Sequence, residues 1–172
     1  RNDGPNSSVE LVAFLTEHGM KTAVAAYPDG HPDARKATHE MSETHWLYRK
    51  LEAGADQIVT QFSARIDGVL RLRDAVERFG EPVEMRVGVM PVPDWERFKT
   101  LIDRCGIEPD PGEALLFDGL PDDSHHALSL GLAYANMRAL RAEGCTSFHL
   151  YGLNDSRLLL PLIRSLQSLD RP

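Results

Sequence analysis

Cysteine is scarce in this chain, and long apolar runs are missing. Only two of the 172 residues are cysteines, Cys105 and Cys145, and they lie far apart with neither a CxxC pair nor another metal-ligand spacing. Such usage is typical of a reducing compartment, where thiols stay free. No apolar run approaches the ~20 residues that a membrane-spanning helix needs, and residues 1–6 lack the apolar segment of a signal peptide. We therefore expect a cytoplasmic protein with no membrane partner.

An excess of basic charge is also absent. The chain has 19 Lys and Arg against 26 Asp and Glu, a net charge of −7, with no polybasic run, which argues against a nucleic-acid partner. No GxGxxG motif and no GxxxxGK motif follows an expected strand, which argues against a dinucleotide fold or a P-loop. The pair Asp122-Asp123 has no partners at metal-ligand spacing. We therefore expect no metal site and interpret the pair as a helix N-cap.

What the chain does contain is an alternation of helix-like and strand-like segments. Helices are expected over 9–18, 38–53, 66–79, 94–104, 124–143 and 156–169, with a short helix before Phe117 and an interruption near Pro161. Strands are expected over 22–27, 58–61, 85–90 and 147–151. Four strands alternating with helices, without a hairpin signal, predict one α/β domain with a parallel sheet and right-handed crossovers. Because a (β/α)8 barrel needs eight strands, this pattern alone allows either a small open doubly wound sheet or half of a barrel.

The second expected strand ends in a polar residue, Gln61. The carboxyl ends of parallel strands are where ligands bind in α/β folds. A neutral amide there can both donate and accept hydrogen bonds, which suits a heterocycle better than a phosphate. The alternative is a polar strand terminus whose hydrogen bonds are satisfied by solvent, and this residue alone favours that alternative.

Five stretches, in order, resemble motifs of the methylenetetrahydrofolate reductase family. Residues 25–34, AAYPDGHPDA, resemble its AxYPxxHPEA signature, and residues 50–62 resemble KxxAGAD followed by TQ. Residues 88–92 are similar to GIxPV, and residues 116–120 and 148–154 to the last two motifs, the latter usually FHFYTLN. The resemblance covers nearly the whole chain and implies the fifth to eighth units of the family's (β/α)8 barrel. We therefore favour the half-barrel and, since the chain does not begin with Met, expect a longer protein that supplies the N-terminal half.

The resemblance implies a flavin-dependent oxidoreductase of one-carbon metabolism and methionine biosynthesis. In this family NAD(P)H reduces FAD and leaves, and 5,10-methylenetetrahydrofolate then takes hydride from flavin N5 to give 5-methyltetrahydrofolate. Ala25, Tyr27 and His31 match positions that line the FAD site, and Lys50 matches one that meets the cofactor's phosphates. Residue chemistry agrees, because a proline-braced loop can hold two rings rigidly and a lysine at a helix end can reach a diphosphate.

Further matches concern the substrate and the chemistry. Gln61 matches the amide that hydrogen-bonds the pterin of folate, and Leu101 matches a position that is Phe or Leu. Asp3 matches an aspartate beside the flavin and is the candidate catalytic residue, although the loop after it is much shorter here. Trp46 stands where an asparagine commonly contacts the cofactor, and Asp155 where a folate-contacting arginine can occur. The family's glutamate on the first strand would precede this chain.

These departures bear more on folate specificity than on the fold, so other functions stay open. A flavin-free or non-catalytic relative could bind a pterin or a protein partner, and an incomplete chain could be an inactive fragment. A barrel enzyme of different chemistry, such as a lyase, could use the same scaffold, because a fold does not fix a function. A homo-oligomer is also compatible with the sequence.

Overall fold

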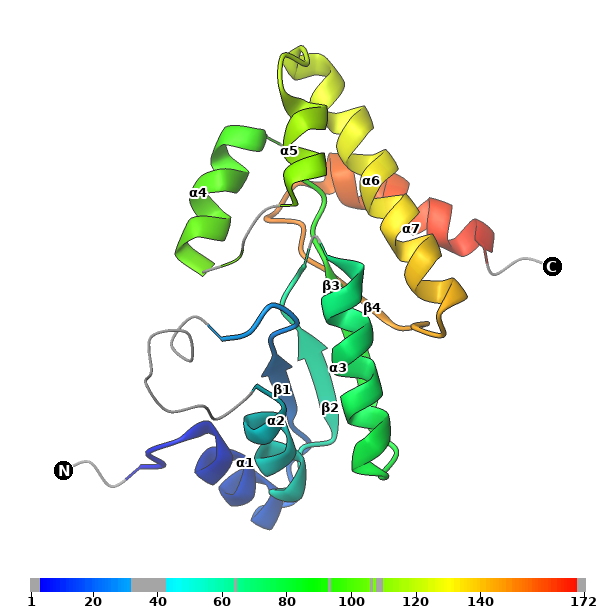
Figure 1. Ribbon diagram of the computed structural model, residues 1–172. Coiled ribbons are helices and arrows are strands. Elements are labelled where there is room, and N and C mark those ends of the chain that lie inside the picture. Colours follow the sequence, from blue (N-terminus) through cyan, green and yellow to red (C-terminus); the bar gives the residue numbers. More distant parts are fainter. Residues whose placement is uncertain are drawn as a thin grey trace.

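The computed structural model describes residues 4–31, 43–63, 65–92, 94–105, 107 and 110–169, in which helices and strands alternate (Figure 1). The helices are α1 (Ser8–Glu17), α2 (Glu43–Glu52), α3 (Ile66–Phe79), α4 (Trp95–Cys105), α5 (Pro111–Phe117), α6 (Asp122–Ala142) and α7 (Ser156–Leu169). The strands are β1 (Ala23–Ala26), β2 (Gln57–Thr60), β3 (Glu84–Val89) and β4 (Phe148–Leu150). The predicted alternation is confirmed, while the first part of the helix expected over 38–53 lies outside the described residues.

The four strands form one sheet in the order β1-β2-β3-β4, and all neighbouring pairs are parallel. The register aligns Val24 with Ile58 and Ile58 with Met85. Each strand adds on the same side of the previous one, so the order has no reversal within the described sheet. An open doubly wound sheet has such a reversal, whereas successive units of a barrel do not. The predicted parallel sheet is confirmed, and its strand order is the one expected of a barrel segment.

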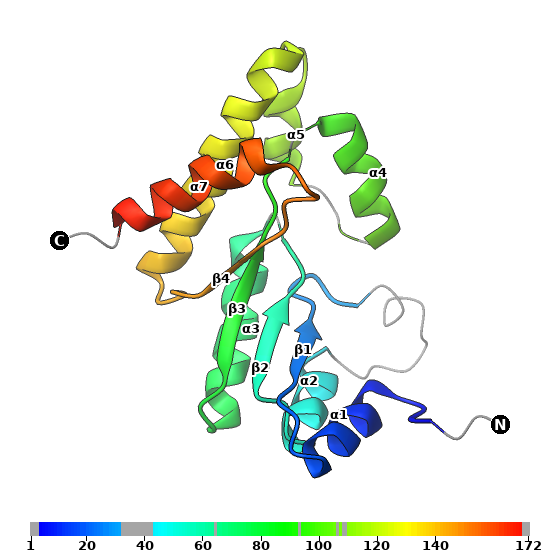
Figure 2. The same cartoon turned by 180° about the vertical axis from the view of Figure 1, so that it is seen from behind.

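Helix α3 covers one face of the sheet (Figures 1 and 2). Its buried residues Val69, Leu72 and Val76 recur at helical spacing. Val69 belongs to the same buried cluster as Val87 of β3, and Leu72 and Val76 share a cluster with Ile58 of β2. Full burial of one such aliphatic side chain contributes about 1.5–3 kcal/mol. The sequence pattern of this helix therefore accounts directly for its place on β2 and β3.

Two local predictions about helices are wrong. Helix α7 continues through Pro161 without interruption. Leu158 and Leu162, each 1 % exposed, anchor the helix on both sides of the proline, which itself lies on the exposed side. The pair Asp122-Asp123 does not cap α6 either, because Pro121 occupies the N-cap position and makes no side-chain cap bond.

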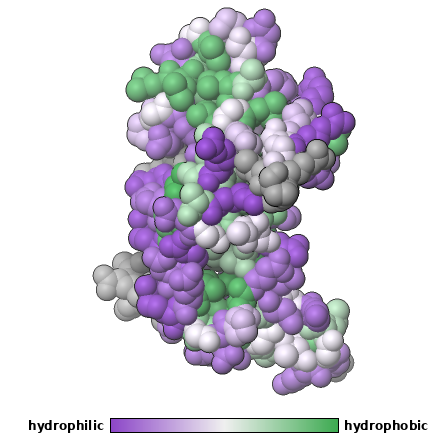
Figure 3. Space-filling model, turned by 90° about the vertical axis from the view of Figure 1, so that its right-hand side faces the viewer, coloured by the Kyte–Doolittle hydropathy of each residue, from purple (hydrophilic) through white to green (hydrophobic). Residues whose placement is uncertain are grey.

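Polar residues cover most of the face seen in Figure 3, and apolar residues gather in its upper part. The upper part of the molecule in Figure 1 is built from α4, α5, α6 and α7. Large exposed apolar side chains on α5 and α7 are Leu115, Leu116, Leu160 and Ile163. None of the helices in the described ranges is both long enough and apolar enough to cross a membrane.

The carboxyl ends of β2, β3 and β4 are tied together by Thr60, which is fully buried. The backbone pairing of β2 with β3 ends at Val59. Beyond it, the Thr60 hydroxyl accepts a hydrogen bond from the N–H of Gly88 (2.9 Å) and donates one to the carbonyl of Gln61 (2.9 Å). The Tyr151 hydroxyl donates to the Thr60 carbonyl at 3.1 Å. A Cβ on Gly88 would overlap that carbonyl and lie 2.8 Å from a ring carbon of Tyr151. We call this set of contacts the Thr60 junction; it sets where the strands separate.

The Thr60 junction can be tested by removing its hydroxyl. We expect Thr60→Val, which keeps the branched shape, to lower the free energy of unfolding by about 1–3 kcal/mol, because it leaves the buried N–H of Gly88 without an acceptor. Thr60→Ser retains the hydroxyl and is the matched control, with a smaller loss. Urea denaturation of the full chain measures both variants. A Val variant as stable as the Ser variant would show that the junction does not hold the strands together.

Strands β1 and β4 each lack a neighbouring strand on one side in the described sheet. Unpaired strand edges expose rows of N–H and C=O groups on which other chains can pair. We therefore expect the 172-residue chain, expressed alone, to self-associate or to be poorly soluble. Sedimentation velocity over a range of protein concentrations measures this association. A monomer with a closed sheet at every concentration would contradict the half-barrel interpretation.

Candidate functional site

The open edge of β1 carries the first group of predicted site residues. The Ala26 carbonyl faces β2, where it accepts a hydrogen bond from the N–H of Gln61 at 2.8 Å. Because successive carbonyls of a strand point to opposite sides, the Ala25 carbonyl faces the open edge. The Lys50 ammonium reaches this carbonyl from α2 and donates to it at 2.9 Å. The structure thus brings together Ala25 and Lys50, which the resemblance assigned to one site.

Tyr27 and His31 lie in the loop that follows β1. Their rings meet edge to face, with centroids 4.6 Å apart. The N–H of Gly30, a residue with φ of 84°, donates to the Tyr27 carbonyl at 3.0 Å and closes the turn between the two rings. The backbone N–H of Tyr27 donates to Glu43 of α2 at 3.1 Å. We call these residues the β1-edge cluster: Ala25, Tyr27, His31, Glu43 and Lys50.

Burial controls the ionisation of the β1-edge cluster. Lys50 is only 8 % exposed, and burial lowers the pKa of its ammonium, while the nearby Glu43 carboxylate opposes that change. Burial also raises the pKa of Glu43, against the opposing effects of Lys50, the Tyr27 N–H and His31. Each charge favours the ionised form of the other. The cluster therefore keeps a cation and a carboxyl group side by side in a partly desolvated place.

Two contributors were not predicted from the sequence. Glu43 lies two helical turns before Lys50, on the same face of α2, and this spacing is the signal that could have identified it. Tyr151 follows β4, and its hydroxyl reaches the Thr60 junction. Burial raises the pKa of Tyr151, and nearby Tyr27 adds to that rise. The two tyrosines therefore lie close together although they follow the first and last strands.

Gln61 lies at the carboxyl end of β2, as predicted. Its N–H donates to the Ala26 carbonyl, and its own carbonyl accepts from the Thr60 hydroxyl. Its side-chain oxygen accepts a hydrogen bond from the N–H of Phe62 at 3.1 Å. Gln61 is thus bonded to the end of β1 on one side and, through Thr60, to Tyr151 on the other.

The structure places three other predicted residues outside the β1-edge cluster or outside the described ranges. Leu101 of α4 is half-buried and packs against the apolar cluster that contains Phe62, the residue after Gln61. Trp46 of α2 is 40 % exposed, and its ring meets His45 edge to face at 5.8 Å. Asp3 lies outside the described residues.

Asp155 follows β4 and is held as a carboxylate. The Arg157 guanidinium, 2.9 Å away, holds the pKa of Asp155 at about 2. His126 of α6 has its Nε2 3.7 Å from the same carboxylate and forms an ion pair with it when protonated. Asp155 is therefore a paired anion rather than a proton donor at neutral pH.

Groups of three or more His, Cys, Asp or Glu that could hold a metal ion are not found among the residues with described positions. Cys105 is a half-buried free thiol and Cys145 a buried one, as expected from their spacing. Burial raises the pKa of the Cys145 thiol, which keeps it protonated and unreactive.

Comparison with known proteins gives consistent results. The family model described as methylenetetrahydrofolate reductase matches residues 1–167. The 5,10-methylenetetrahydrofolate reductase of Escherichia coli (strain K12) is 32 % identical over 160 residues, which cover 91 % of this chain and 53 % of the relative. Methylenetetrahydrofolate reductase (NADH) 1 of Arabidopsis thaliana is 28 % identical over 155 residues, which cover 86 % of this chain and 26 % of the relative. The chain therefore spans about half the length of the bacterial relatives that it matches.

A solved structure shares the fold. It is described as an uncharacterized protein from Clostridium thermocellum that binds two copies of 5-methyl-5,6,7,8-tetrahydrofolic acid. It matches with a TM-score of 0.59 over 94 % of this chain and 58 % of that chain, at 11 % sequence identity, so the likeness concerns the fold alone. The family match is the stronger finding, because it extends over nearly every residue. This chain belongs to the methylenetetrahydrofolate reductase family.

Proposed function

We propose that this chain forms the fifth to eighth units of the (β/α)8 barrel of a flavin-dependent methylenetetrahydrofolate reductase. Family membership supports an oxidoreductase of this type. The strand order without reversal, and the span of about half the bacterial relatives, support a barrel segment. The observation that carries the proposal is the convergence of α2 and the loop after β1 on one strand edge, with Gln61 at the end of the next strand.

The β1-edge cluster has the chemistry that FAD requires. Lys50 offers a buried cation to the diphosphate, and Tyr27 and His31 offer a fixed pair of rings. The Lys50 ammonium now donates to a neutral carbonyl, and a phosphate oxygen is a stronger acceptor for the same proton. Because burial raises the pKa of Glu43, its carboxyl can take up a proton when an anion binds, which reduces repulsion. When bound, FAD would supply hydride transfer, while these residues hold and orient it.

The substrate side of the proposal depends on Gln61. Its amide can donate and accept at the carboxyl end of β2, and a pterin edge presents both donors and acceptors. Helix α4 brings Leu101 into the apolar cluster of Phe62, directly after Gln61. The Clostridium thermocellum protein, described as binding a methylated folate, supports a folate ligand on this fold. NAD(P)H as reductant of the flavin and a cytoplasmic location complete the proposal.

Replacing Lys50 tests the cofactor site. Lys50→Ala should weaken FAD binding by about 10–150-fold, because loss of a charge-assisted phosphate contact typically costs ~1.5–3 kcal/mol. Lys99→Ala, which removes a lysine paired with Glu96 on α4, is the matched control. Fluorescence titration of FAD into the complete barrel protein measures both. Equal affinity of the Lys50→Ala variant and the unaltered protein for FAD would exclude Lys50 from the site.

Replacing Gln61 tests the substrate site. Gln61→Leu should slow the folate half-reaction at least about 10-fold, because unpaired polar groups of a buried pterin cost a few kcal/mol. Oxidation of NAD(P)H with an artificial acceptor needs only the flavin and should change much less. Gln57→Leu, at the amino end of the same strand, where the amide donates to Glu84, is the control. Stopped-flow measurement separates the two half-reactions, and equal loss in both would mean that Gln61 is structural.

A flavin-free relative that binds a pterin is the second candidate, and the carboxyl group beside Lys50 favours it. Glu43 adds negative charge beside Lys50, where a phosphate would bind. The colour of the purified protein separates the candidates, because a flavoprotein absorbs in the visible flavin band. A colourless protein that still binds 5-methyltetrahydrofolate would establish the second candidate.

A further inference from the structure

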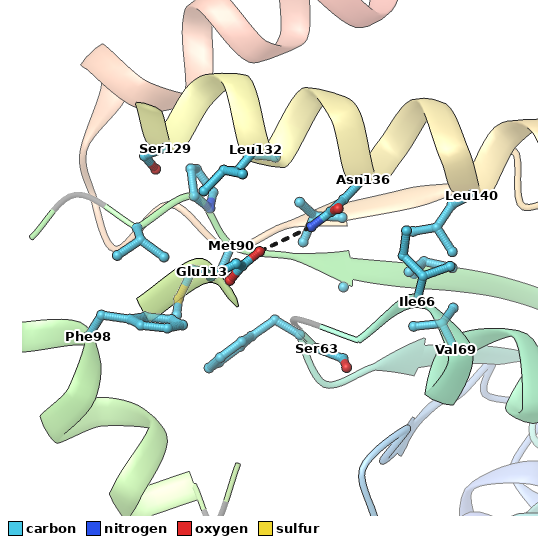
Figure 4. A pocket seen from close by; sticks show the side chains of 17 residues that line it. Ser63, Ile66, Val69, Met90, Phe98, Glu113, Ser129, Leu132, Asn136 and Leu140 are labelled. Atoms are coloured by element: carbon cyan, nitrogen blue, oxygen red, sulfur yellow. Dashed lines mark hydrogen bonds between the residues drawn. The ribbon is translucent and has the colours of Figure 1, made fainter. Parts of the chain in front are cut away.

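A narrow cavity of about 40 Å³ lies beside β3, next to Phe62 and Phe98 of the apolar cluster that contains Leu101 (Figure 4). It is bounded by β3, α3 and α6, with the short helix α5 closing one side. None of the predicted site residues that the structure describes lines it. Most of its wall is apolar, and its polar side chains are Ser63, Glu113, Ser129 and Asn136.

Ser129 is a buried polar group in the wall of this cavity. It is 2 % exposed, and its hydroxyl has no hydrogen-bond partner among the described residues. Buried hydroxyls of folded proteins are almost always hydrogen-bonded, either to protein or to ordered water. Leu132 and Ala133, on the same helix and in the same wall, are apolar. A partner for the Ser129 hydroxyl therefore has to come from within the cavity.

Glu113 of α5 contributes a carboxyl group to the side of the cavity that faces α6. The side-chain nitrogen of Asn136 donates to its carboxyl oxygen at 3.5 Å, as the dashed line in Figure 4 shows. Among the described residues that line the cavity, Glu113 is the only titratable side chain; those of β3, α3 and α6 include none. Burial raises the pKa of Glu113, and Asp110, the N-cap of α5, adds to that rise. A protonated carboxyl group can donate as well as accept, whereas a carboxylate only accepts.

We propose that this cavity is a hydration site, which binds about three ordered water molecules between the Ser129 hydroxyl and the Glu113 carboxyl group. Its volume is about three times the ~10–15 Å³ that one water molecule requires. Purely apolar cavities stay dry, whereas this one has hydrogen-bonding groups on both sides. Organic ligands fill several hundred Å³, and a hard cation needs more oxygen ligands than one carboxyl group provides. Water is therefore the ligand that fits both the size and the chemistry.

The bound water connects α5 to α6 and β3. Helix α5 also carries Phe117, whose ring stacks on Trp95 of α4 with centroids 5.0 Å apart and planes 5° apart. Helix α4 in turn carries Leu101. Hydration of the cavity thus supports the α4–α5 pair, to which Phe98 and Glu113 in the cavity wall belong.

Ser129→Ala tests the hydration site in the full chain. If water bonds the hydroxyl, its removal should lower the unfolding temperature by about 2–4 °C, although alanine favours helices more than serine does. Ser168→Ala on α7, where the exposed hydroxyl donates to the Ser165 carbonyl, reports the effect of helix propensity. If Ser129→Ala raised the unfolding temperature as much as Ser168→Ala does, the proposal would be overturned. In a dry cavity the substitution would only remove a buried hydroxyl that has no hydrogen-bond partner.

Water–protein NOEs at the amides of Ser129 and Ala133 in the unaltered protein should reveal long-lived water, and their absence would also overturn the proposal.

Glu113 gives the cavity a pH dependence of definite sign. Because its pKa is raised in the folded protein, its stabilising contribution is complete below the unfolded pKa of about 4.3. The contribution is lost as the pH rises through the folded pKa. Glu113→Gln keeps the size and the hydrogen-bonding groups and should remove this loss, so that the variant gains stability over the unaltered protein toward about pH 8. Exposed Glu81→Gln is the control, and thermal unfolding between about pH 4 and pH 8 measures all three. The same pH dependence with and without Glu113 would show that this carboxyl is solvated and does not belong to the site.

Discussion

The buried hydroxyl of Thr60 is the constraint on which the carboxyl end of the sheet depends. Where two parallel strands separate, their N–H and C=O groups lose each other as partners, and buried backbone groups need replacements. Thr60 takes part in both replacements. Its hydroxyl accepts a hydrogen bond from the N–H of Gly88, and its carbonyl accepts one from the hydroxyl of Tyr151. The strands can therefore diverge at their carboxyl ends without leaving orphaned groups. Gln61 leaves the sheet at this point with its N–H bonded to Ala26 of β1 and its carbonyl accepting from the Thr60 hydroxyl.

Helices α4 and α5 are joined to the strand ends by aromatic packing. Phe62 lies 6.1 Å from the ring of Phe98 and 5.9 Å from that of Tyr151. Trp95 and Phe117 then stack within the same apolar cluster and join α4 to α5. One ring in the loop after β2 thus connects the strand ends with the helices above them. Aromatic pairs of this kind contribute about 0.5–1.5 kcal/mol beyond the area that they bury, so the connection is specific without being rigid.

Helices were predicted best from the sequence where apolar residues recur at regular helical spacing and a glycine follows the last of them. The bounds of α3 agree with the predicted helix because its apolar spacing is regular and Gly80 ends it in a left-handed conformation. The prediction failed at Pro161, where the burial of Leu158 and Leu162 outweighs a local rule. Nothing in a one-dimensional pattern shows that a threonine or a serine will be fully buried, so the roles of such residues emerge only from tertiary contacts.

The residues of the candidate site were likewise predictable from the sequence only in part. The resemblance supplied Ala25, Tyr27, His31 and Lys50, and the structure brings these four residues together at one strand edge. It did not supply Glu43, because that residue lies in no quoted motif, and its place became clear only from the bond to the Tyr27 N–H. A motif can thus identify residues that line a site. The carboxyl group that pairs with the lysine was found only from the packing of α2.

The bond between the Lys50 ammonium and the Ala25 carbonyl also has a consequence for assembly. A parallel strand that joined the open edge of β1 would bring its own N–H groups to this carbonyl, whose two lone pairs can accept from the strand and the ammonium at once. In the proposed complete barrel, an anionic cofactor that attracted the ammonium would leave the new strand as the remaining donor to this carbonyl. Pairing of a further strand with β1 and binding of an anionic cofactor would then involve the same backbone oxygen.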